Sequence, residues 1–278
     1  MSAISFKLMI PTKNFLKALH FMKSEDAVAE VLDFVTIVGI LMLSFSLIGL
    51  VGYPALKNAQ EARYIENTKQ SFVVLADNIN KVATGQAPSH GGVIKMYGGT
   101  LSVTGGSTIQ VNMTVYNSTS NSIEEKYVLE QMRSIENSIG DTKVVYEGTG
   151  VWVKYPTGYV LNAYKPLITN RSDILIIPVI YINGFPAKSG TDMSKITVCQ
   201  QEIPSEEGGC GQPSITYWSN VSNVTVIITG DYNSGWKDYF NGTMKWSTSA
   251  DGTYTARLND TRNLDVYILK SQLYTEIT

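Results

Sequence analysis

The pattern of hydrophobic and polar positions divides the chain into three parts, of which the first is an uncharged stretch near the N-terminus. Residues 34–56 contain no charged side chain, which makes 23 consecutive uncharged positions. About 20 apolar residues span the hydrocarbon core of a bilayer as a helix. The pattern therefore predicts a membrane-length helix over residues 27–56.

Two other interpretations of this stretch are a buried helix of a soluble core and a secretory signal peptide. Core helices rarely run so long without a polar face. A signal peptide would be followed by a small-x-small cleavage site, and the residues from Tyr53 to Leu56 do not provide one. We therefore favour a membrane-spanning helix.

The second part, residues 57–87, has the periodicity of an amphipathic helix. We expect one helix from about Ala27 to Thr84, with Pro54 removing a hydrogen bond and kinking the axis. Gly85 and Pro88 are typical helix stop signals. The apolar residues recur at spacings of three, four or seven and form one stripe, which must pack on something: Ala59, Ala62, Ile65, Phe72, Leu75, Ile79 and Val82.

The third part, residues 88–278, has the pattern of β-strands. Short runs rich in Val, Ile, Thr and Tyr alternate with glycine turns, as in "TKVVYEGTGVWVKYPTGYVLNAY". Pro178, in "SDILIIPVIYI", suggests an edge strand or a bulge. Residues 121–139 fit a helix or two strands, and we favour strands. The predicted fold class is α+β, with a long N-terminal helix packed on a β-rich, sandwich-like head.

The stretch "DYNSGWKDYFNGT", residues 231–243, predicts a turn capped by Asx side chains. Its aromatic residues are expected to anchor the core. Asp231, Asn233 and Asp238 offer oxygen ligands for calcium, but they lack the spacing of an EF-hand loop. We expect no metal site here.

The charge distribution predicts the orientation of the chain in the membrane. The net charge of −2 gives no reason to expect a nucleic-acid partner. Residues 1–24 contain no acid and four lysines, which predicts a cytoplasmic N-terminus and an extracellular C-terminus: Lys7, Lys13, Lys17 and Lys23. Residues 1–26 are then a basic leader that lies on the inner leaflet or is cleaved. A start at Met9 or Met22 is a third alternative.

Two features fit an extracellular head, the first being its two cysteines. Cys199 and Cys210 flank a short polar loop and would pair in an oxidising environment. Two free thiols are the alternative. A zinc site would need further ligands, and the two histidines, His20 and His90, are far apart in sequence.

The second feature is a set of seven N-x-S/T sequons, all of which lie in the predicted extracellular part. They are candidate glycosylation sites, although each asparagine also fits an ordinary strand or turn position. The asparagines are Asn112, Asn117, Asn170, Asn220, Asn223, Asn241 and Asn259.

Motifs of common enzymes are absent from the sequence. It contains no phosphate-binding glycine loop between a strand and a helix and no G-x-S-x-G elbow. We therefore predict no catalytic residue and no cofactor. An enzyme acting on surface glycans remains an alternative, and it would require an acidic cleft in the head.

Glu30 and Asp33 lie directly before the apolar stretch. At a spacing of three they share one helix face. A carboxylate near the bilayer costs several kcal/mol without a partner. The upstream lysines could supply one. If the leader is cut near Glu25–Ala27, so could the new amino terminus of the same or a neighbouring subunit. Alternatively, both acids only mark the headgroup boundary.

The stretch "EDAVAEVLDFVTIVGILML" resembles the N-terminus of archaeal type IV pilin-like proteins. Later stretches, including "ALKNAQEARYIENTKQSFVVLADNINKVATG" and "GDTKVVYEGTGVWVK", are similar to a group of such surface proteins from haloarchaea and methanogens. In that family a prepilin-type peptidase removes the leader, and the retained apolar helix forms the filament core. The resemblance implies that the leader is cut at Ala27, next to Asp26. Lys23 is the nearest basic residue before this cut. In this chain "KSED" replaces the basic residue that usually precedes the cut.

The resemblance implies a subunit, major or minor, of a type IV pilus-like filament or surface assembly used in adhesion. Its partners would be the membrane and other subunits, in a homo- or hetero-oligomer formed through the N-terminal helix. Glu30 and Asp33 would act in assembly. The first alternative is a non-assembling, single-span binding protein of the cell surface, and the second is the surface enzyme.

Overall fold

The computed structural model describes the backbone of residues 12–200, 212–243, 246–250, 254–258 and 263–278. Side chains are described for residues 28–200, 212–242 and 263–278. The chain divides after Gln60 into two units, which are treated in turn.

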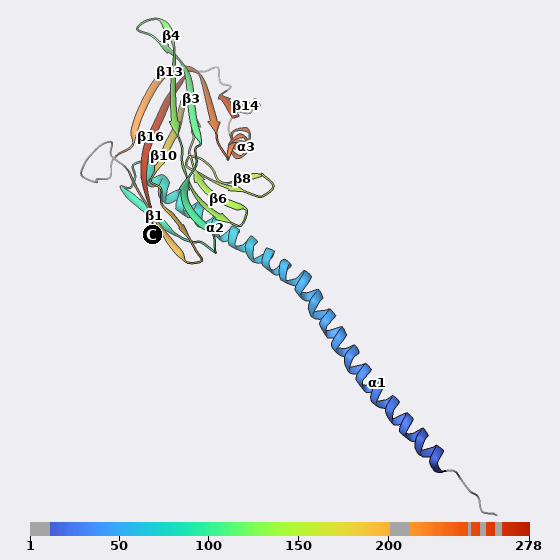
Figure 1. The fold of residues 1–278 in the computed structure, drawn as a ribbon. Coiled ribbons are helices and arrows are strands. Elements are labelled where there is room, and N and C mark those ends of the chain that lie inside the picture. The colour runs from blue at the N-terminus through green and yellow to red at the C-terminus, as the bar shows by residue number, and fades with distance from the viewer. Residues whose placement is uncertain (1–11, 201–211, 244–245, 251–253, 259–262) are drawn as a thin grey trace, which may run out of the picture. The chain divides into compact units, whose positions relative to one another are not determined.

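The N-terminal helix consists of α1 (Thr12–Leu47), the π-helical segment η1 (Ile48–Gly52) and α2 (Tyr53–Ala83) (Figure 1). The sequence predicted helix over most of this range, with a lost hydrogen bond and a kink at Pro54. Proline has no N–H to donate to the carbonyl four residues earlier, and its ring crowds that carbonyl. Here the carbonyl belongs to Leu50, which lies within η1, so a wider π-helical turn accommodates the proline.

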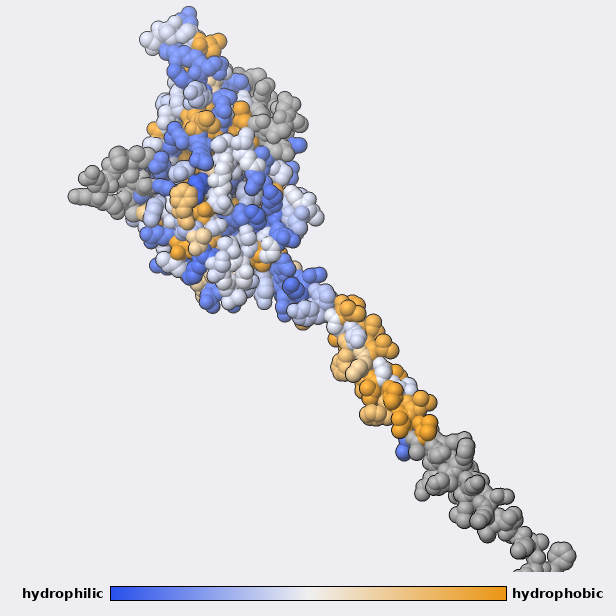
Figure 2. All heavy atoms as spheres, viewed as in Figure 1, coloured by the Kyte–Doolittle hydropathy of each residue, from blue (hydrophilic) through white to orange (hydrophobic). Residues whose placement is uncertain are grey.

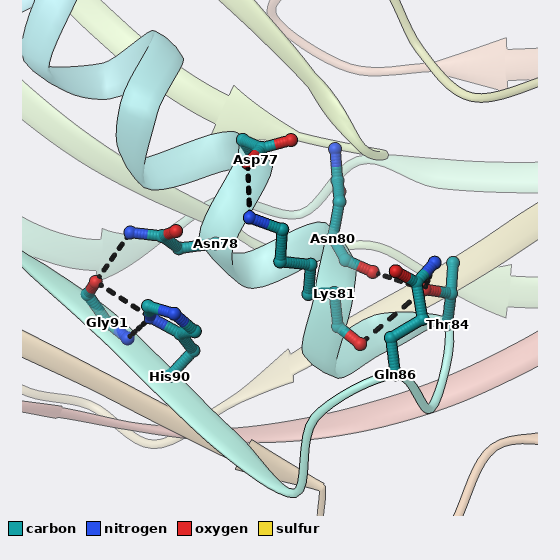
Figure 3. Close-up of polar contacts among 8 residues, drawn as sticks. All are labelled: Asp77, Asn78, Asn80, Lys81, Thr84, Gln86, His90 and Gly91. Carbon is teal, nitrogen blue, oxygen red and sulfur yellow. Dashed lines mark hydrogen bonds and ion pairs between the residues drawn. The ribbon is translucent and has the colours of Figure 1, made fainter.

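The end of α2 is fixed by glycine, as predicted. Gly85 has φ +76°, a left-handed conformation that favours glycine, and its N–H donates to the Val82 carbonyl at 3.0 Å. The side-chain amide of Asn78 donates to the Gly91 carbonyl at 2.9 Å (Figure 3). This bond ties the last turns of α2 to the first strand of the head.

The described strands form two sheets. The six-stranded sheet has the order β11-β2-β5-β6-β7-β8. Its strands are β2 (Thr100–Thr104), β5 (Ser134–Ile139), β6 (Thr142–Glu147), β7 (Gly150–Lys154), β8 (Val160–Tyr164) and β11 (Ala187–Ser189).

The ten-stranded sheet has the main path β1-β12-β16-β13-β15-β14, with β10 and β9 beside β16, and β3 and β4 beside β13. Its strands are β1 (Ser89–Lys95), β3 (Thr108–Asn117), β4 (Ser122–Gln131), β9 (Thr169–Arg171), β10 (Ile174–Asn183), β12 (Met193–Gln200), β13 (Ser214–Thr229), β14 (Trp246–Ala250), β15 (Tyr254–Leu258) and β16 (Leu264–Ile277). Residues 121–139 are therefore largely strand, as expected.

The pairing of strand β10 explains why it tolerates a proline in its middle. It pairs with β16 along its whole length, in the one parallel pairing among the described strands, and with β9 only over Ile174–Ile176. Pro178 lies opposite Leu269 and beyond the end of β9. Pro178 therefore has a strand neighbour on one side only. An edge position of this kind tolerates a residue without an N–H, so the edge prediction is confirmed.

Helix α2 packs into the head along the predicted stripe. Phe72, Leu75, Ile79 and Val82 are fully buried and share a core with strands of both sheets. Ile65 is partly buried against the same core. The upstream alanines of the stripe are exposed, so the packed part of the helix begins near Ile65.

A second core lies on the opposite face of the six-stranded sheet. Neighbouring residues of β6 and β7 alternate between the two cores: Val144 and Val151 belong to the first, Val145 and Trp152 to the second. Because strand side chains alternate in direction, this sheet is buried on both faces. Strands β3, β13 and β16 of the larger sheet complete the second core.

Residues 233–243 form a helix, α3 (Asn233–Thr243), where the sequence predicted a capped turn. Burial outweighs the poor helix propensity of its Asn, Gly and Thr residues. Trp236, Tyr239 and Phe240 are buried in the second core, as expected. Trp236 packs against Trp152 with ring centroids 4.8 Å apart.

Candidate functional site: an exposed apolar helix and its acids

The main candidate site is the helix surface from Val28 to Leu56. Each described side chain here is exposed except that of Val38, which is half-buried, and the large apolar ones are 51–74% exposed. Figure 2 shows this surface as predominantly hydrophobic. Burying one such side chain is worth about 1.5–3 kcal/mol. The surface is therefore suited to lipid or to other apolar helices rather than to water.

The hydroxyl groups within this stretch are satisfied inside the helix. Thr36, Ser44 and Ser46 each donate to the backbone carbonyl four residues earlier, at 2.7–2.8 Å. A helix in hydrocarbon must satisfy its polar groups internally. These three bonds satisfy the hydroxyl groups, which would otherwise oppose insertion into the bilayer.

Glu30 and Asp33 lie on the exposed helix directly before the uncharged stretch. Among the described residues neither carboxylate has a hydrogen-bond or ion-pair partner. The nearest upstream base, Lys23, belongs to α1, as do Asp26 and Ala27, but the side chains of these three lie outside the described residues. Their role in processing stays a prediction.

The disulfide between Cys199 and Cys210 likewise stays a prediction. Cys199 lies in β12, is half-buried, and pairs across the sheet with Ser89 and Tyr274. Cys210 lies outside the described residues.

The structure places six of the seven sequons. Asn220, Asn223 and Asn241 are exposed. Three others are half-buried: Asn112, Asn117 and Asn170. Asn259 lies outside the described residues.

Sequence reasoning missed a pair of buried acids in the head. Glu147 accepts hydrogen bonds from Ser107 Oγ at 2.7 Å and from Trp236 Nε1 at 3.2 Å. Burial raises the pKa of Glu147 to about 7, against the lowering effect of these two donors. The only sequence signal was its place in β6, on the same face as Val145.

The second acid, Glu136, lines a hollow of about 270 Å³ together with Ser134, Asp231 and other residues. Its carboxylate accepts from Tyr232 Oη at 2.7 Å and from Lys143 Nζ at 2.9 Å. Burial opposes its ionisation, but hydrogen bonds from Lys143, Tyr232 and Ser138 outweigh it and lower the pKa.

The surface-enzyme alternative requires an acidic cleft, and this hollow is the nearest match in the described residues. Both buried carboxylates, however, already accept hydrogen bonds from other residues of the head. Each links two or more elements of the core. This arrangement favours a structural role for the two acids.

The described residues contain one helix long and apolar enough to cross a membrane, Val28–Ala83. With the β-rich domain that follows, this helix fits a single-pass membrane protein. The chain belongs to DUF7289, a family of unknown function whose model matches residues 27–273. No curated protein and no solved structure matches it.

Proposed function

We propose that the chain is a pilin-like subunit of an archaeal type IV pilus-like filament or surface assembly that acts in adhesion. One observation carries the proposal: an exposed, uncharged helix of membrane length follows two acids and continues into a helix that forms the core of a β-rich domain. The basic residues before Glu30 support a cytoplasmic N-terminus and an external head.

The exposed surface from Val28 to Leu56 would hold the subunit in lipid before assembly and contact neighbouring helices afterwards. Between apolar helices, association relies on close packing because the lipid already satisfies the hydrophobic effect. The unpaired carboxylate of Glu30 would then set the register. A neighbour that fails to supply a positive charge leaves it unpaired, at a cost of several kcal/mol.

Removal of the leader would create this positive charge, as the new amino terminus of the neighbouring subunit. The family match begins at Ala27, the position where the pilin resemblance implies a new amino terminus. Intact-mass measurement and N-terminal sequencing of the protein from its native membrane test this step. We expect loss of residues 1–26; retention of Met1 or Met22 as the first residue would contradict it.

Glu30→Gln is the matching test of assembly, with Asp141→Asn, at an exposed acid of the head, as the control of equal charge change. We expect Glu30→Gln to remain in the membrane fraction but to lose filaments in negative-stain images, whereas Asp141→Asn keeps them. Equal assembly of both variants would show that Glu30 does not set the register.

The second candidate is a non-assembling, single-span binding protein. The internally bonded hydroxyls of Thr36, Ser44 and Ser46 favour it, because such a helix is complete in lipid without a partner. Cross-linking in native membranes separates the two. A ladder of subunits supports the assembly, and a monomer together with an uncleaved leader supports the anchored binding protein.

A further inference from the structure

Four sequon asparagines lie on two neighbouring strands of the larger sheet. Asn112 and Asn117 belong to β3, and Asn220 and Asn223 to β13. The register places Asn223 opposite Thr114 and Asn112 opposite Thr225. Asn112 and Asn223 therefore project from the same face, because directly paired residues share a face and Asn112 and Thr114 are two apart.

This face also carries exposed apolar side chains from the neighbouring strand β4. Tyr127 lies directly opposite Asn112 and is 73% exposed; Leu129 lies opposite Gln110 and is 55% exposed. Directly opposite residues have Cβ atoms about 4.5–5.5 Å apart. A group attached to Asn112 would therefore lie beside the Tyr127 ring.

The amide of Asn112 is free to carry such a group. Its Oδ1 accepts from Gln110 Nε2 at 2.8 Å, and within the described structure its Nδ2 donates to no partner. By contrast, the Nδ2 of Asn117 donates to Glu124 at 2.7 Å. A shallow hollow of about 280 Å³ adjoins Asn112 and Tyr127.

A second protein strand is a poorer occupant of this face. Within the described structure β4 pairs with β3 alone, so its outer edge is open. That edge strand carries the consecutive charges Glu124, Glu125 and Lys126, a feature that discourages strand addition.

We propose that Asn112 carries an N-linked saccharide whose first sugars lie over Tyr127 and Leu129. The proposal rests on the external orientation of the head given under the proposed function. The donor would be a lipid-linked saccharide phosphate. A bond forms between the sugar C1 and Asn112 Nδ2, the C1–phosphate bond breaks, and the phosphate leaves with its electron pair. Nδ2 gives up one proton and keeps the other.

The apolar side of a sugar ring would then cover the exposed tyrosine ring, and its hydroxyls would face water. This arrangement removes an exposed apolar group from solvent without a protein partner. A saccharide at Asn223 would extend the same covered face across β13.

The test uses the full chain from its native membrane. Glycopeptide mass spectrometry shows whether Asn112 is modified, and nitration with tetranitromethane reports the reactivity of Tyr127. Tyr159, 56% exposed and placed directly before β8 of the other sheet, is the internal control. We expect Tyr127 to react several-fold more slowly than in the Asn112→Gln variant, with Tyr159 unchanged.

Substitutions in the sequon provide matched controls. Thr114→Ala removes the acceptor signal but keeps Asn112, and should expose Tyr127 as Asn112→Gln does. Thr114→Ser keeps the signal and should keep the protection. A loss of protection in Thr114→Ala alone would show that folding, rather than the saccharide, had changed.

Three results would overturn the inference. An unmodified Asn112 peptide, with saccharides at Asn220 or Asn223, would overturn it and leave the proposed function standing. Unmodified peptides at every sequon would also count against an external head. Equal protection of Tyr127 in the parent and in Asn112→Gln would show that a saccharide on Asn112 does not cover this face.

Discussion

The hydroxyl of Tyr146 in β6 donates a 2.9 Å hydrogen bond to the side-chain oxygen of Asn80 in α2, and both residues are buried. The Asn80 amide also donates to the Thr149 carbonyl at 3.0 Å. Asn80 therefore joins α2 to the β6–β7 hairpin. Burial raises the pKa of Tyr146, so its hydroxyl stays a donor.

This pair gives a prediction about how the helix is held to the head. Tyr146→Phe should lower the free energy of unfolding by about 1–3 kcal/mol, because it leaves the buried Asn80 oxygen without a donor. Asn80→Ala should cost at least as much, since it also leaves the Thr149 carbonyl unpaired. Denaturant unfolding of the full chain in detergent measures both.

The double variant distinguishes a direct bond from two separate defects. A double-mutant cycle with Tyr146→Phe and Asn80→Ala should give costs that do not add, because the variants share one bond. Additive costs would show that the two residues stabilise the head independently.

Glu147 predicts a fall in stability as the pH rises. Its pKa is about 7 in the folded protein and near its usual 4.5 in the unfolded chain. The folded state thus keeps the proton longer. The stabilising effect is complete below pH 4.5 and is lost as the pH rises to about 7, a difference of roughly 3 kcal/mol.

The matched variant is Glu147→Gln, which keeps the shape and stays neutral. Its unfolding free energy should change less than that of the parent across this window. Glu136→Gln is the opposing control. The lowered pKa of Glu136 contributes stability above its unfolded pKa that is lost on acidification. A parent profile that stays flat between pH 4.5 and 7 would contradict an inaccessible, protonated Glu147.

Periodicity predicted the helix and a buried stripe from Ala59 to Val82, which is confirmed from Ile65 onward because one face of α2 meets one core there. Ala59 and Ala62 are exposed instead. The residue type of Gly85 predicted the stop of the helix. Periodicity also predicted strands over residues 121–139. These features depend on local pattern and on residues with strong backbone preferences.

Periodicity could not reveal α3 or the buried acids. In "DYNSGWKDYFNGT" the local preferences favour a turn, and only the second core, built from distant strands, stabilises the helix. Glu147 depends on Ser107 and Trp236, 40 and 89 residues away in sequence. The exposed helix and the position of Glu30 were readable from the sequence, whereas the alignment of Asn112 with Tyr127 required the register.

The membrane role of the apolar stretch predicts a strong effect of added charge. Ile40→Lys with Leu43→Lys places two charges mid-span, where each costs about 2.5–3.5 kcal/mol. We expect the protein to leave the membrane pellet. The control, Ala59→Lys with Ala62→Lys, changes two exposed positions after the span and should not. Retention of both variants in the pellet would contradict membrane insertion of this stretch.

The predicted disulfide can be measured directly. The native full chain should be lighter by two hydrogens than its reduced form and should resist alkylation at Cys199 and Cys210. Cys210→Ser should lower the free energy of unfolding by about 3 kcal/mol, because the closed loop restricts the unfolded chain. Alkylation of both cysteines in the untreated protein would exclude the bond.

Gly148 predicts a large effect of adding a single methyl group. A Cβ at this position would lie 2.5 Å from Cζ2 of the buried Trp236, and the residue has φ +56°. Gly158 also has positive φ, +84°, but a Cβ there meets nothing within 4 Å. Gly158→Ala should therefore cost only backbone strain, about 1 kcal/mol. Gly148→Ala should cost about 1–3 kcal/mol more, because Trp236 must shift in a packed core. Unfolding free energies of the two variants, with tryptophan fluorescence to report the shift, measure the difference; equal costs would show that the Trp236 site is loosely packed.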